Sequence, residues 1–305
     1  MSLTPMYKQV AITASMLFAL FACTTQPEIK SSSCIHETFH IPATPRSLYF
    51  FNQQINLQDW DIKERLDREL LVNTYFQSST SLAIKRANRY FPAIEKILKE
   101  EGVPDDFKYL CVAESNLSNV VSPAGAAGFW QFMPGTAPSY GLKINDEIDD
   151  RNNLEKSTRA ACNLIKSNHA LFNDWINACA AYNRGPGGLQ QDMNSQGVTH
   201  FFDTELNPET ARYVFRIMAL KMILENPKAY GYNLTNDQRY LSIPVKAVLV
   251  KQPINNLALW ARNHKTSLKI VRLLNPWILG NQLSKKSVPC TIELPKNKNQ
   301  FGLYK

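Results

Sequence analysis

Apolar positions spaced three or four residues apart recur along most of the chain, and this spacing predicts a mainly α-helical protein. Pro92 and Pro104 are positioned to begin helices, and Gly102 to end one. The predicted helices cover residues 61–77, 92–102, 104–114, 154–172, 174–182 and 208–224. After residue 240 the pattern changes to β-branched runs at 243–250 and 288–294 around a helical centre, which predicts a small α+β domain.

The N-terminal residues have the pattern of an export signal. Lys8 precedes an apolar run from Val10 to Ala22 that is shorter than a membrane-spanning helix. The small residue before Cys23 resembles a bacterial lipobox, which implies that residues 1–22 are a lipoprotein signal peptide and that Cys23 is acylated. A plain signal peptide and an uncleaved anchor are the alternatives. Residues 23–56 are punctuated by Ser, Thr and Pro, so we expect a tether there, followed by domains at 57–240 and 241–305.

Composition narrows the class of protein. With 305 residues, 44% hydrophobic and 20% charged, the chain has ordinary globular composition, which excludes simple disorder. A net charge of +8 suits an anionic partner, such as nucleic acid, an acidic membrane surface or a carboxylate-bearing wall polymer. The export signal argues against nucleic acid. There is no CxxC or HExxH spacing, so we expect no metal and no cofactor. Cys111, Cys162 and Cys179 lie in apolar helical patterns and are expected to be buried free thiols.

The predicted helix 104–114 carries a carboxylate on its apolar face. Phe107, Leu110 and Cys111 occupy positions i, i+3 and i+4, and Glu114 occupies position i+7 of the same face. Burial and the negative end of the helix dipole both raise the pKa of a carboxyl group. A carboxylic acid that stays protonated near neutral pH can protonate the leaving oxygen of a sugar. The alternative is that Glu114 turns outward at a frayed helix end.

Four ordered sequence blocks surround this glutamate. They are Glu114-Ser115, the glycine-punctuated run at 122–134 that contains Phe-Trp-Gln, the Ala-Tyr-Asn-Arg-Gly run at 181–185, and Tyr213. In this order and spacing they resemble the catalytic domain of the family 1 lytic transglycosylases, in the membrane-bound lytic murein transglycosylase D branch. The resemblance covers roughly residues 60–230. It departs from the Gly-Leu-Met-Gln of many members at residues 129 and 130.

The resemblance implies a lysozyme-like helical fold in which Glu114 is the sole catalytic acid and base. The muramic acid is then cleaved by attack of its own 6-hydroxyl, which leaves a 1,6-anhydro end. The implied substrate contacts are Ser115, Trp130, Gln131, Tyr182, Asn183 and Tyr213. All of these except Gln131 have a structural alternative: a polar cap for Ser115, the core for Trp130 and Tyr213, and a helix C-terminal stop for Tyr182 and Asn183.

A glycosidase usually needs two carboxylates. Asp146, Glu147, Asp149 and Asp150 could supply the second one. We expect instead that they form a solvated loop, with Asp150 as an N-cap for the helix near residue 154.

Residues 246–294 follow the strand, helix, helix, strand order of a LysM carbohydrate-binding module, although the usual Gly-Asp-Thr start is absent. The sequence thus predicts a lipid-tethered periplasmic enzyme, at the outer membrane, that cleaves the bond between N-acetylmuramic acid and N-acetylglucosamine in the glycan strands of peptidoglycan. A hydrolysing muramidase and a noncatalytic wall-binding lipoprotein are the alternatives.

Overall fold

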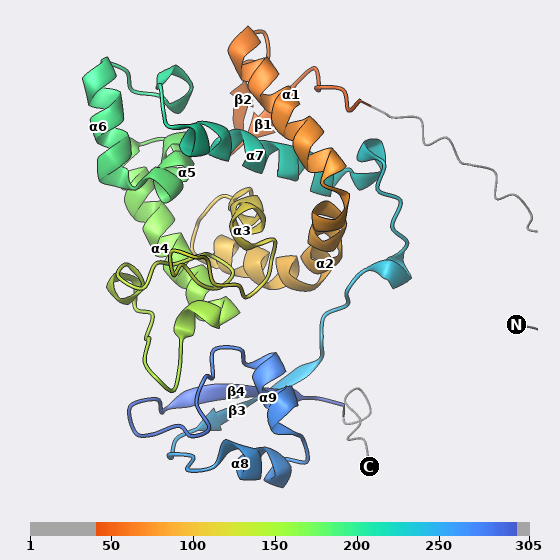
Figure 1. Cartoon of the computed structure of the whole chain (residues 1–305), viewed down its shortest axis with the longest axis vertical. Helices are drawn as coiled ribbons and strands as arrows, with labels where there is room; N and C mark the ends of the chain where they lie inside the picture. The colour runs from red at the N-terminus through yellow and green to blue at the C-terminus, as the bar shows by residue number, and fades with distance from the viewer. Residues whose placement is uncertain (1–40, 298–305) are drawn as a thin grey trace, which may run out of the picture. The chain divides into compact units, whose positions relative to one another are not determined.

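The computed structural model describes residues 41–297, of which residues 48 to 295 carry the helices and strands (Figure 1). The predicted signal peptide, Cys23 and residues 23–40 of the predicted tether lie outside the described part. The described residues form one compact unit by their contacts. The predicted mainly α class is confirmed. No helix within residues 41–297 combines the length and apolar character that crossing a membrane requires.

Seven α-helices lie between residues 60 and 225, with a long non-helical segment between the third and the fourth. They are α1 (Trp60–Tyr75), α2 (Gln77–Glu100), α3 (Phe107–Ser115), α4 (Leu154–Phe172), α5 (Trp175–Arg184), α6 (Pro186–Gln196) and α7 (Pro208–Glu225). Short 3-10 turns lie at Ala137–Tyr140, Asp150–Asn152, Phe201–Asp203, Pro227–Tyr230 and Asn236–Gln238. Side-chain caps begin several of the helices, because a carboxylate or amide oxygen accepts the unpaired N–H groups of the first turn. Asp59, Asn153, Asp174 and Asn207 cap α1, α4, α5 and α7.

Two helices differ from the prediction. Pro92 lies inside α2 rather than at its start. A proline removes one helical N–H, but Ile84, Ile94 and Leu98 of this helix are almost fully buried, and that burial outweighs the loss. Helix α6 was not predicted, because its glycines and polar residues give a weak pattern; it begins at Pro186 and buries only Leu189 and Met193.

A β-hairpin precedes the first helix, so the tether predicted for residues 23–56 is too long. Strands β1 (Leu48–Phe50) and β2 (Gln53–Ile55) pair antiparallel. Phe50 is 0% exposed and Phe51 stacks on Phe107 with ring centroids 4.3 Å apart. The hairpin escaped the sequence analysis because its strands are three residues long and have no visible periodicity.

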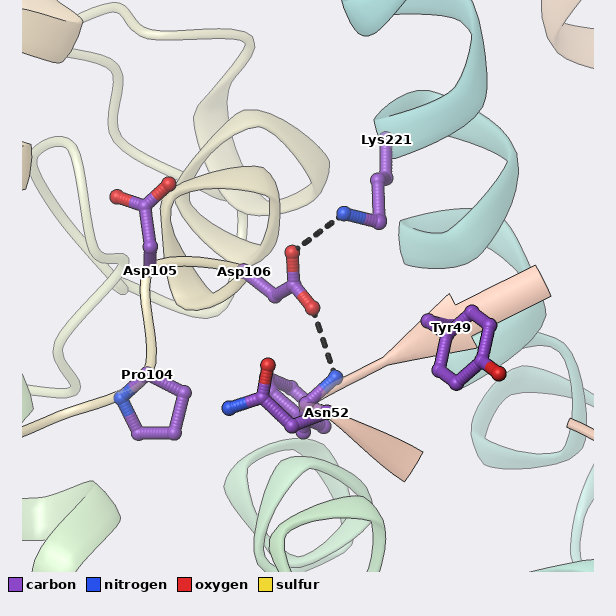
Figure 2. Close-up of a pocket in the computed structure, with 7 residues that line it drawn as sticks. Tyr49, Asn52, Pro104, Asp105, Asp106 and Lys221 are labelled. Atoms are coloured by element: carbon purple, nitrogen blue, oxygen red, sulfur yellow. Dashed lines mark hydrogen bonds and ion pairs between the residues drawn. The ribbon is translucent and has the colours of Figure 1, made fainter. Parts of the chain in front are cut away.

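Asp106 fastens this hairpin to the helices. Its carboxylate accepts a hydrogen bond from the backbone N–H of Phe51 at 2.7 Å and pairs with the Lys221 ammonium of α7 at 2.7 Å. Figure 2 shows the Asp106 carboxylate between Lys221 and the hairpin. A cavity of about 210 Å³ beside it is lined by Tyr49, Phe51, Asn52, Pro104, Asp105, Asp106 and Lys221. No predicted site residue lines that cavity.

Helix α3 is the central element of the helical part (Figure 1). It packs against α2 and α7, while α4 packs against α5 and α1 against α7. Phe107, Leu110 and Cys111 are each 0% exposed, which confirms the apolar face predicted for this helix. Cys111, Cys162 and Cys179 are buried free thiols, as expected.

The C-terminal part has two strands and two short helices. Strands β3 (Val245–Val250) and β4 (Cys290–Pro295) pair antiparallel, with Val245 opposite Pro295 and Val250 opposite Cys290. Helices α8 (Leu257–Asn263) and α9 (Leu268–Leu274) lie between them in sequence. Their shared core contains Leu257, Val271, Trp277, Leu283 and Ile292, together with Ile148 from the helical part. The strand, helix, helix, strand order is the predicted one.

Candidate active site

Glu114 lies in the last turn of α3, where the apolar face of this helix meets α7. Its side chain is half-buried, and its Oε1 accepts a short hydrogen bond from the Tyr213 hydroxyl of α7. Tyr213 is only 3% exposed. The structure therefore brings together two residues that are 99 positions apart in the sequence, and the frayed-end alternative for Glu114 does not hold.

The environment of Glu114 favours its protonated form. Desolvation by the buried surroundings raises the pKa of Glu114 to about 7, against the opposing effects of the Tyr213 hydrogen bond and the Arg216 charge. The negative charge of Glu209 raises this pKa further. A carboxyl group with a pKa near neutrality can give up a proton and take one back at the same pH, as a single acid and base requires.

Helix α7 presents three polar side chains that act on Glu114: Glu209, Tyr213 and Arg216, at positions i, i+4 and i+7 of one face. Sequence reasoning identified only Tyr213, although the spacing could have indicated the other two. Arg216 Nε lies 3.8 Å from Oε2 of Glu69, and Glu69 is 1% exposed. Glu69 also accepts a 2.7 Å hydrogen bond from Arg212. A buried carboxylate on α1 therefore holds two arginines of α7.

A segment that we call the strap, residues 125–132, lies against the end of α3. The Ser115 hydroxyl donates to the Phe129 carbonyl at 2.7 Å and to the Cys111 carbonyl at 3.2 Å. Ser115 is 7% exposed, and both acceptors of its hydroxyl are backbone carbonyls. The side chain predicted to touch the glutamate or the substrate instead fastens the strap to α3.

Gly128 allows the close approach of the strap to a neighbouring loop. Its φ is +82°, and a Cβ placed there would overlap the carbonyl oxygen of Arg151. Both observations exclude a larger residue. On the other side of the strap, the Gln131 amide donates to the Val120 carbonyl at 3.0 Å and to the Gly128 carbonyl at 2.8 Å. The side-chain oxygen of Gln131 accepts no hydrogen bond from the described residues, so it can accept one from a ligand.

Trp130 does not offer a face to a sugar. Its ring is 0% exposed, and its indole N–H donates to the Thr158 hydroxyl of α4 at 2.9 Å. The prediction of Trp130 as a substrate contact is therefore wrong, because an indole that can satisfy its one donor inside the core gains more from full burial. The backbone of Trp130 still matters to the site, since its carbonyl accepts the Tyr182 hydroxyl at 2.7 Å.

Tyr182 and Asn183 come together near the end of α5, where the sequence placed a helix stop. Tyr182 is partly exposed, and its phenol bonds the strap through Trp130. Burial and the nearby Glu114 charge raise the pKa of Tyr182 well above its ordinary value. The Asn183 amide donates to Glu209 at 3.2 Å, and its carbonyl accepts the Thr210 hydroxyl at 2.8 Å. Asn183 thus joins α5 to the start of α7.

The acidic run at 146–150 is not the solvated loop that the sequence predicted. Glu147, Asp149 and Asp150 are 7%, 6% and 1% exposed, and Asp146 alone of the four is exposed. Each buried carboxylate has a partner, since burying an unpaired charge is costly. Asp149 pairs with Arg151 at 2.7 Å and Asp150 with Lys156 at 2.8 Å. Asp150 is also not the N-cap of α4, because Asn153 fills that position.

Comparisons with known proteins match two parts of the chain to known families. Residues 91–203 match the family described as Transglycosylase SLT domain, and residues 246–298 match the Soluble lytic transglycosylase C-terminal LysM-like domain. Over 202 residues the chain is 33% identical to Membrane-bound lytic murein transglycosylase D from two strains of Escherichia coli. That alignment covers 62% of this chain and 44% of the relative, so the chain spans less than half the length of these curated relatives.

A solved structure shows a weaker similarity. It is the X-ray structure of an inactive mutant of the lytic transglycosylase Slt from Pseudomonas aeruginosa, with 22% identity over 50% of this chain and 26% of that chain, and a TM-score of 0.38. At these values the similarity does not establish the fold, which rests on the family matches. Residues 91–203 therefore correspond to a transglycosylase SLT domain and residues 246–298 to a C-terminal LysM-like domain, and over 202 residues the chain is homologous to membrane-bound lytic murein transglycosylase D.

Proposed function

We propose that this chain is a lytic transglycosylase that cleaves the β-1,4 bond between N-acetylmuramic acid and N-acetylglucosamine in peptidoglycan. The observation that carries the proposal is the protonated state that the site favours for Glu114: a pKa near 7, in apolar surroundings, with the carboxyl group oriented by Tyr213. The transglycosylase domain match and the homologous murein transglycosylases support the same activity.

The reaction needs one group that first donates a proton and then accepts one. Protonated Glu114 gives its proton to the glycosidic oxygen, and the bond between this oxygen and C1 of the muramic acid breaks. The Glu114 carboxylate then takes the proton of the 6-hydroxyl while that oxygen bonds to C1. The product is a 1,6-anhydro ring, no water is consumed, and Glu114 returns to its protonated form. Tyr213 keeps the carboxyl group in one orientation through both steps.

The remaining site residues divide into two groups. Gln131, with a free amide oxygen, and Tyr182 and Asn183, at the exposed end of α5, are proposed to bind sugar hydroxyl and acetamido groups. Ser115 and Trp130 act through the strap that they hold against α3 and α4. We propose that the catalytic domain extends from the hairpin at 48–55 to residue 240, so that it begins before the predicted boundary at residue 57, and that the LysM-like module lies within residues 241–305.

Hydrolysis by a muramidase mechanism is the second candidate, and Glu209 is the observation in its favour. A hydrolase needs a second carboxylate to activate water or attack C1. Glu147, Asp149 and Asp150 are engaged elsewhere, whereas the exposed Glu209 is close enough to raise the pKa of Glu114. Its bond to Asn183 gives it a structural role as well.

The partners follow from the same proposal. Glycan strands of peptidoglycan are the substrate, and their stem peptides carry carboxylates that a basic chain attracts. We also propose that Cys23 carries a lipid that holds the protein at the periplasmic face of the outer membrane. A lipid on Cys23 would hold the protein at the membrane surface that faces the wall.

Mass spectrometry of digested sacculi tests the function. A soluble form that starts near residue 35 should release muropeptides that end in 1,6-anhydro-muramic acid. Reducing ends in their place would favour the muramidase mechanism, and the absence of any product would leave a wall-binding protein. A Glu114→Gln form of the same protein controls for contaminating enzymes, since it should release nothing.

A further inference from the structure

A loop of the catalytic domain is built into the C-terminal domain. Residues 145–150 form a tight turn in which the Asn145 side chain accepts the backbone N–H groups of Glu147 at 2.8 Å and Ile148 at 2.9 Å. At the tip of this turn, Ile148 is 2% exposed and belongs to the core of the C-terminal domain. Ile148 also forms a β-bridge with Ile278. An apolar side chain of one domain thus completes the core of the other.

Backbone bonds flank this contact on both sides. The Glu147 carbonyl accepts the N–H groups of Leu279 at 2.8 Å and Gly280 at 3.1 Å, and the Asp149 N–H donates to the Trp277 carbonyl at 2.8 Å. A Cβ on Gly280 would come within 3.2 Å of the Glu147 Cα. The two backbones therefore approach as closely as neighbouring strands of a sheet.

The Glu147 side chain closes the contact. Its Oε2 accepts the Ser287 hydroxyl at 2.6 Å and the Ser284 backbone N–H at 2.8 Å. These hydrogen bonds hold the pKa of Glu147 below its usual range. Glu147 is 7% and Ser287 4% exposed, so water does not readily replace either bond if one partner is removed.

The same loop continues into the residues that hold the strap. The Asp149 carboxylate accepts hydrogen bonds from the Arg151 backbone N–H and from Nε and Nη2 of its guanidinium. The remaining Arg151 Nη1 donates to the strap carbonyls of Gly125 at 2.8 Å and Phe132 at 3.1 Å. Because the Arg151 backbone also lies against Gly128, this one residue fixes both ends and the middle of the strap.

The other side of the strap lies against the residues next to Glu114. Ser115 holds the Phe129 carbonyl and Tyr182 holds the Trp130 carbonyl. A continuous series of packed and hydrogen-bonded groups therefore runs from Ser287, through Glu147, Asp149 and Arg151, to the neighbours of the proposed acid.

We propose that the C-terminal LysM-like domain is a fixed support of the active site, which positions the strap through residues 147–151. Glu147 and Arg151 are positioning residues, and neither contacts the substrate. The expected effect on catalysis rests on the proposed function. The coupling between the loop at residues 145–150 and the strap does not depend on it.

Glu147→Ala in the full-length chain tests the coupling, with Asp146→Ala as the matched control. Asp146 is the exposed neighbour of Glu147 and makes no side-chain hydrogen bond or ion pair within residues 41–297. Amide hydrogen exchange of the peptide that covers residues 125–132 reports on the strap directly. We expect faster exchange there in Glu147→Ala and no change in Asp146→Ala.

Steady-state rates on purified glycan strands test the consequence. Glu147→Ala should lower kcat by roughly 2- to 30-fold, the usual range for residues along a coupling network, with little change in KM. A change in KM alone, with an unperturbed strap, would mean that the module only binds glycan and would overturn the proposal. Faster amide hydrogen exchange confined to residues 277–287 would also overturn the proposal, because the strap would then be unaffected.

A milder variant covers the case in which Glu147→Ala unfolds. Ser287→Ala removes one hydroxyl in the C-terminal domain, far along the sequence from every proposed catalytic group, and should change strap exchange and kcat in the same direction by a smaller factor. If it leaves both unchanged, the proposal fails. A wild-type chain without turnover would refute the proposed function, and the exchange measurements would still decide the coupling.

Discussion

Replacing Glu114 by Gln changes the charge of the proposed acid and little else. The amide has the shape of the carboxyl group, and its oxygen can accept the Tyr213 hydroxyl that now bonds Oε1. It cannot donate a proton to a glycosidic oxygen. We therefore expect a folded protein that has lost at least the roughly 10²- to 10⁴-fold that general acid catalysis commonly supplies.

The same substitution should make the protein more stable at high pH. The folded pKa of Glu114, about 7, lies above the ordinary value of 4.5, so the folded chain binds more protons between these values than the unfolded chain does. Stability from this group is complete below pH 4.5 and is lost as the pH rises through 7. At about 1.4 kcal/mol per pKa unit, the carboxylate costs the wild-type chain up to about 3 kcal/mol above pH 7. Gln does not ionise and avoids that cost.

Urea unfolding of both proteins at pH 5 and pH 8.5, followed by circular dichroism, measures the difference. The free energy of unfolding of Glu114→Gln relative to wild type should rise by roughly 2 to 3 kcal/mol between the two pH values. Equal differences at both pH values would show that Glu114 is solvated and would remove the physical basis of the assignment. Turnover within tenfold of wild type would refute the catalytic role itself.

We expect three further outcomes, two from the structure and one from the sequence around Cys23. Gly128→Ala should destabilise the chain by more than about 2 kcal/mol, because the added Cβ overlaps a backbone carbonyl at a φ of +82°; Gly135→Ala, with open space around it, is the control in the same thermal melt. Glu209→Gln should lower the pKa of Glu114, because the Glu209 charge raises it, and the basic limb of the rate-against-pH curve should then move to lower pH. The products should keep their 1,6-anhydro ends and gain no reducing ends. Cys23→Ser should shift the protein from the membrane pellet to the soluble fraction, and retention after a salt wash would contradict a lipid anchor.

The sequence by itself determined most of the helices and the position of the proposed acid. Periodicity is a local property, so the apolar face of Phe107, Leu110 and Cys111 was visible along one helix, and Glu114 could be placed on that face before any tertiary contact was known. The start of α7 at Pro208 and the strand, helix, helix, strand order after residue 240 were legible for the same reason.

Only the tertiary structure decided what each polar side chain touches. Trp130 and Ser115 are residue types that suit a substrate or an interior equally well, and their burial depends on α4 and the strap, which lie at other positions of the chain. Acidic side chains in a loop, such as the four at 146–150, normally indicate a solvated surface, yet Glu147, Asp149 and Asp150 are buried. They are buried because Arg151, Lys156 and residues 284–287 supply partners. The periodicity of a sequence does not predict which distant residue will pair with a given side chain.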